Sequence, residues 1–140
     1  CSPNPLLVRL EALPGKEAEL AEFLTGARSI VMDESGTVAW FETVDRDLEA
    51  AGYGGKRLMA ADLLSAFWLF GNFPPVEGAA PWYYGELSGI GNADYVVVPM
   101  CPSSLLVRGD ILKALKEAGY TLTEVRRTKS YILIEPRRAL

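Results

Sequence analysis

Hydrophobic and polar residues alternate along residues 6–13, and this period of two predicts a half-buried β-strand. Residues 16–27 change to a helical period, with apolar side chains opposite three glutamates, which predicts an amphipathic helix. Residues 33–36 predict a turn, and residues 37–44 are rich in β-forming side chains. The first third of the chain is therefore predicted to be strand, helix and strand.

The middle of the chain contains a longer apolar segment. Residues 58–70 are apolar nearly all round a helical wheel, which predicts a helix buried on several sides or at an interface. Several prolines follow and exclude a continuous helix over residues 72–85, although residues 82–87 predict a short strand. The polar residues 45–55 predict a solvated turn in preference to a cation site formed by their acidic side chains, which are Asp45, Asp47 and Glu49.

The last third again alternates between strand and helix patterns. Residues 95–100 contain three consecutive valines, which predict a central strand. Asp110 is predicted to cap the start of a helix that ends at Gly119. Residues 120–127 and 130–135 predict two strands joined by a tight turn. Together these elements predict a single α+β domain over the whole chain, with a ferredoxin-like antiparallel sheet and helices on one face.

Composition excludes several classes of function. Of the 140 residues, 49% are hydrophobic and 23% are charged, which is ordinary for a globular protein with a real core. The net charge of −4 disfavours nucleic-acid binding over a broad face. No apolar run has the length of a transmembrane helix. We therefore expect neither a nucleic-acid partner nor a transmembrane segment.

The chain contains no histidine and only two cysteines. Catalytic triads with histidine, histidine-ligated metals and haem with an axial histidine are therefore excluded. A disulfide framework is not indicated, and Cys101 is predicted to be a buried structural cysteine in preference to a nucleophile. Cys1 has two interpretations: a processed or trimmed end of a cytoplasmic protein, or the lipid anchor of a lipoprotein.

Residues 7–44 combine a strand, a Pro-Gly turn, an amphipathic helix, a Ser-Gly turn and an aromatic strand, in the sequence LVRLEALPGKEAELAEFLTGARSIVMDESGTVAWFETV. This layout resembles the opening half of the antibiotic biosynthesis monooxygenase domain family, whose members pair into dimeric α/β barrels. The resemblance implies an oligomer. It also implies the family's cofactor-free branch, which oxidises polycyclic aromatic substrates in an apolar pocket. Residues 93–140 exceed the family's usual domain.

Aromatic side chains are the candidates for a ligand site. Trp40 lies on a predicted strand, and Trp82, Tyr83 and Tyr84 follow the proline-rich loop, where binding residues are often found. Core packing, a dimer interface or a docking surface for another protein are the alternatives for these side chains.

Two functions therefore remain open. The first is a cofactor-independent, monooxygenase-like protein that binds or oxidises an apolar aromatic small molecule, with no metal or other cofactor. The second is a non-catalytic accessory subunit that uses the fold as an interaction platform in a larger complex.

Overall fold

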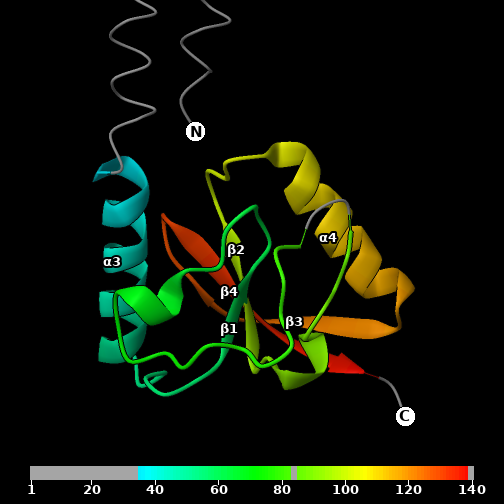
Figure 1. Cartoon of the computed structure of the whole chain (residues 1–140), viewed down its shortest axis with the longest axis horizontal. Coiled ribbons are helices and arrows are strands. Elements are labelled where there is room, and N and C mark those ends of the chain that lie inside the picture. The colour runs from blue at the N-terminus through cyan, green and yellow to red at the C-terminus, as the bar shows by residue number, and fades with distance from the viewer. Residues whose placement is uncertain (1–34, 83–84, 139–140) are drawn as a thin grey trace, which may run out of the picture. The chain divides into compact units, whose positions relative to one another are not determined.

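The computed structural model describes residues 35–82 and 85–138 (Figure 1). The chain divides into two compact units, Cys1–Trp40 and Phe41–Leu140. Of the first unit only residues 35–40 are described, and they begin helix α3. The second unit contains the sheet and is described by itself. The single domain predicted over the whole chain stays a prediction.

Helix α3 spans Ser35–Ala50, so the strand predicted over residues 37–44 is wrong. The turn predicted over residues 45–55 is also wrong for residues 45–50, which belong to the same helix. The reason lies in the spacing of the apolar side chains. Phe41, Val44 and Leu48 are all buried and recur every three or four residues, as one stripe of a helix does. Packing of this stripe overrides the β-propensity of single residues. The predicted strand at 6–13 and helix at 16–27 lie outside the described residues.

Four strands form one open, mixed sheet in the order β1-β2-β4-β3. They are β1 (Leu58–Ala60), β2 (Tyr95–Pro99), β3 (Tyr120–Arg127) and β4 (Tyr131–Arg138). Strands β2, β3 and β4 confirm the strands predicted in the last third. The β2–β4 and β4–β3 pairs are antiparallel as predicted, but β1 runs parallel to β2, so the sheet is mixed.

Helix α4 (Leu105–Glu117) connects β2 to β3, and β4 lies between these two strands. This split β-α-β unit is compatible with a ferredoxin-like fold. The helix begins earlier than predicted, because Ser104, and not Asp110, is its N-cap and accepts a hydrogen bond from the Val107 amide at 3.2 Å. Gly119 has a φ of 92° and ends the helix as predicted.

The helix predicted over residues 58–70 is wrong. Strand β1 and the short 3-10 helix η1 (Phe67–Leu69) occupy this region instead. All three residues of β1 are buried, since the strand is covered on both faces, and such a strand is as uniformly apolar as a buried helix. The strand predicted over residues 82–87 is absent from its described part, and a second 3-10 helix, η2 (Ile90–Asn92), follows.

Helices α3 and α4 lie on opposite faces of the sheet (Figure 1). Side chains alternate between the two faces along each strand. The α4 face holds a buried cluster that includes Met59, Val96, Val98, Val107, Ile111 and Leu115. The opposite face holds Leu133, Arg126 and Tyr131, and the last two contact Asp47 of α3. For the described helices, the prediction of helices on one face is therefore wrong.

Candidate functional site

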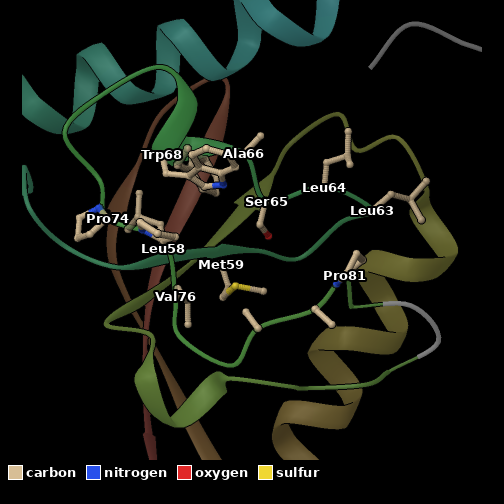
Figure 2. Close-up of a pocket in the computed structure, with 14 residues that line it drawn as sticks. Leu58, Met59, Leu63, Leu64, Ser65, Ala66, Trp68, Pro74, Val76 and Pro81 are labelled. Atoms are coloured by element: carbon tan, nitrogen blue, oxygen red, sulfur yellow. The ribbon is translucent and has the colours of Figure 1, made fainter.

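An apolar groove of about 370 Å³ lies beside strand β1. Its lining comes from Leu58 and Met59 of β1, from residues 63–68, and from residues 74–76 and 79–81. Figure 2 shows the labelled side chains grouped around Met59. The lining residues of β1 are buried, whereas Leu64 and Trp68 are each 52% exposed at the edge of the groove. The groove therefore offers apolar surface that is still in contact with water.

The chemistry of the groove is that of a binding site. Among the described residues that line it, none has an ionisable side chain. The Ser65 hydroxyl accepts a hydrogen bond from the Ala60 amide at 2.8 Å, which fixes the turn after β1. A general acid or base is thus missing from the described lining. What the lining can do is remove apolar ligand surface from water.

Helix α3 supports the segment 67–75, whose two ends line the groove. Phe41 of the helix packs edge-on against Phe67, with ring centroids 5.1 Å apart, and stacks on Phe70 at 5.8 Å. Two turns further along the helix, Glu49 accepts a hydrogen bond from the Asn72 amide at 2.7 Å. These contacts fix the middle of the segment and so position the groove lining on both sides of it.

Asp45 lies between these two contacts on the same stripe of α3. Its side chain is buried, with the residue 1% exposed, and neither carboxyl oxygen forms a hydrogen bond with the described residues. Burial, together with the negative charge of Glu49, raises the pKa of Asp45 to about 7. The solvated turn predicted for this residue is therefore wrong. The carboxyl of Asp45 is therefore mainly protonated below about pH 7, whereas an ordinary aspartate is ionised above its pKa of 3.8.

Asp47 is directed to the sheet. It accepts hydrogen bonds from Arg126 Nε at 3.0 Å and Nη2 at 2.9 Å, and from the Tyr131 hydroxyl. Its hydrogen bonds with Arg126 and Tyr131 lower the pKa of Asp47, while burial and the Asp47 hydrogen bond raise that of Tyr131. Within the described residues, no group of acidic or cysteine side chains could hold a metal ion. Asp47 and Glu49 of α3 thus have structural contacts.

The predicted ligand contacts are distributed over several places. Trp40 is half-buried on α3. Trp82 is 1% exposed within the α4-side cluster, and its indole N–H donates to the Ser88 carbonyl at 2.7 Å. Its neighbour Pro81 lines the groove, but Trp82 does not. Tyr83 and Tyr84 lie outside the described residues. A ligand-binding role for the four aromatics stays a prediction, and Trp82 matches the alternative of core packing.

Sequence reasoning missed Leu64 and Trp68 as groove residues because it assigned both to a buried helix. One sequence signal was available: the Pro74-Pro75 pair, which forces the chain to turn back beside β1 and also lines the groove. The prediction of a buried Cys101 is wrong, since this residue is exposed and disulfide-bonded, which leaves it no thiol to act as a nucleophile. Cys1 lies outside the described residues.

In comparisons with known proteins, the chain matches no family model, no curated protein and no solved structure. Neither described helix has the length and apolar character needed to cross a membrane.

Proposed function

We propose that this protein binds an apolar small molecule in the groove beside β1. The observation that supports the proposal most directly is the lining itself, which is apolar, lacks ionisable side chains among its described residues and leaves Leu64 and Trp68 half exposed. Covering such side chains gains about 25 cal/mol for each Å² of apolar surface removed from water. An exposed indole also offers a flat face on which an aromatic ring can stack.

Oxidation of the bound molecule is the second part of the proposal. It derives from the resemblance to the antibiotic biosynthesis monooxygenases, which also implies pairing into a dimeric α/β barrel. The described lining of the groove offers no base, so the substrate must be acidic enough to lose its proton to water, as a polycyclic phenol is. Dioxygen would be the oxidant: one of its oxygen atoms would enter the ring to form a quinone, and the other would leave as water. Turnover of a polycyclic phenol in the presence of a chelator and without flavin would support this part.

A fluorescence titration with the neutral apolar dye Nile red tests the binding proposal. Leu64→Asp places a charge at the edge of the groove and should weaken dye binding by about tenfold or more, since a desolvated carboxylate costs over 1.4 kcal/mol. Leu105→Asp is the matched control, because Leu105 is also an exposed leucine, at 67%, but lies outside the groove lining. Equal loss of affinity in both variants would refute the groove as the binding site.

An interaction platform is the second candidate. Several large apolar side chains are exposed in the second unit: Leu64, Trp68, Leu69, Leu105, Leu106 and Val125. Apolar surface of this kind favours contact with a protein, either a second copy or a subunit of a larger complex. Light scattering should give a dimer mass if a second copy covers Leu105 and Leu106 at the start of α4, and Leu106→Asp should then return the protein to monomers. A monomer mass at micromolar concentration would contradict self-association.

A further inference from the structure

We propose that Asp45 is a protonation-dependent latch for the groove: its neutral carboxyl keeps the segment 67–75 docked on α3, and its ionised form releases that segment. The proposal rests on the proposed function only for its effect on ligand binding, because the latch itself is a property of α3 and the segment. It arises from the position of Asp45, which lies between the two contacts, at Phe41 and Glu49, that fix the segment.

The carboxyl group of Asp45 is enclosed between α3 and the segment 67–75. The segment covers it through Gly71, where a Cβ atom, if one were added, would lie 2.9 Å from Asp45 Oδ2. No water-sized gap is available on that side, and neither oxygen has a hydrogen-bond partner among the described residues. A carboxylate in this site would be desolvated without compensation. It can become hydrated only if the segment moves away from the helix.

Several charged side chains lie on the elements around the Asp45 carboxyl. On α3 itself these are Glu42, Arg46, Asp47 and Glu49, and the negative charge of Glu49 is the one that raises the pKa of Asp45 further. The segment 67–75 contains no ionisable side chain. The turn after α3 also contacts the segment, because the Gly55 amide donates a hydrogen bond to the Asn72 carbonyl at 2.6 Å. The ionisable residues closest to Gly55 in the sequence are Tyr53 and Lys56. On the sheet, Arg126 and Tyr131 are bound to Asp47. No described cation pairs with Asp45.

Ionisation of Asp45 would act on the groove through the two ends of the segment 67–75. Phe67 and Trp68 precede the covered stretch and line the groove, and Pro74 and Pro75 follow it and line the groove as well. Release of residues 70–73 from α3 would therefore loosen both parts of the lining. The pKa of about 7 for the docked state, against 3.8 for a free carboxyl, defines the pH range in which this occurs. Over that range the equilibrium constant for release should rise by up to about tenfold per pH unit, and it should level off above it.

Two measurements on the whole protein test the latch without any ligand. The ¹³Cγ resonance of Asp45 should titrate with a midpoint near pH 7. Hydrogen exchange of the amides of residues 70–73, corrected for the intrinsic effect of pH, should accelerate by about tenfold per pH unit between pH 5 and 7. Asp45→Asn should abolish this acceleration, and Asp47→Asn should retain it.

A midpoint near pH 4, or exchange in residues 70–73 that does not depend on pH, would overturn the latch. The ¹³C titration and the hydrogen exchange of the parent protein need no variant, so together they decide the question even where Asp45→Asn fails to fold. The latch and the proposed function fail separately. Nile red binding that is lost in Leu64→Asp but unaffected by pH leaves the groove proposal intact and removes the latch. A pH-dependent segment in a protein that binds no dye does the reverse.

Discussion

Gly71 packs so closely against Asp45 that a Cβ atom at residue 71 would lie 2.9 Å from the carboxyl oxygen Oδ2 and 3.0 Å from the Asp45 Cβ. A glycine is thus needed where the segment 67–75 crosses α3. Gly71→Ala should lower the free energy of unfolding by about 1–3 kcal/mol, because the added methyl overpacks the contact. Urea denaturation measures this change. Gly91→Ala is the control, since a Cβ there meets nothing within 4 Å, and equal losses in both variants would contradict the close contact.

The stability of the protein should depend on pH through Asp45. Its pKa is raised to about 7 in the folded state, so its contribution is fully present below pH 3.8 and is lost as the pH rises to 7. Asp45→Asn should remove this dependence of the unfolding free energy on pH. The difference in stability between the variant and the parent protein should therefore favour the variant more at pH 8 than at pH 5. Urea midpoints across this range provide the test. A parent protein and a variant with parallel pH profiles would contradict a raised pKa.

Asp47 should contribute to stability with a pH dependence opposite to that of Asp45, and Asp47→Asn should reveal it. Hydrogen bonds from Arg126 and Tyr131 lower the pKa of Asp47, so its contribution is present above the unfolded pKa and is lost as the pH falls. Asp47 is about one third exposed, and water weakens the ion pair. A loss of about 1–2 kcal/mol at pH 7, shrinking towards pH 3, is therefore expected from urea denaturation. An unchanged midpoint at pH 7 would mean that the contact with the β3–β4 hairpin is not stabilising.

Trp82→Phe should reveal whether this tryptophan serves the core or a ligand. The indole N–H donates to the Ser88 carbonyl, and the side chain is fully enclosed. Loss of the hydrogen bond and of volume should lower the unfolding free energy by about 1–3 kcal/mol. Nile red affinity of the folded variant should remain that of the parent protein. Weaker dye binding without a loss of stability would instead support the ligand-binding role predicted from the sequence.

Gly109→Ala should stabilise the protein, because Gly109 lies in the middle of α4 and an added Cβ meets nothing within 4 Å. Replacing a helical glycine by alanine gains about 0.5–1 kcal/mol. Thermal unfolding monitored by circular dichroism measures the effect. This variant changes no contact of α3 or of the groove. A lower midpoint would contradict the helix bounds given for α4.

The sequence predicted best the elements whose signals are local. The valines of β2 and the glycine that ends α4 are such signals, and strand β2 and the end of α4 are found where expected. The start of α4 has a local signal in the Ser104 N-cap, for which Asp110 was mistaken, and a second support that comes from far along the chain. Asp62 accepts hydrogen bonds from the Ser103 and Ser104 amides at 2.7 and 3.2 Å, a contact that no local pattern indicates.

The groove was missed for a related reason. A uniformly apolar stretch fits both a buried helix and a buried parallel strand, and pairing of β1 with β2 decides between them. Once β1 ends at Ala60, Leu64 and Trp68 become exposed side chains at the edge of a groove instead of one face of a helix. The burial of Asp45 was also hidden, because an acidic residue in a polar stretch predicts solvent exposure.

Mapping a bound apolar molecule on the protein tests the central proposal most directly. The ¹⁵N-labelled protein is titrated with naphthalene at pH 6, where Asp45 is largely protonated, and the shift of each backbone amide is recorded. Binding in the groove predicts saturable shifts concentrated in residues 58–68 and 74–81, which are reduced in Leu64→Asp and retained in Leu105→Asp. Saturable shifts confined to the exposed start of α4, or no shifts at all, would contradict the groove as a ligand site.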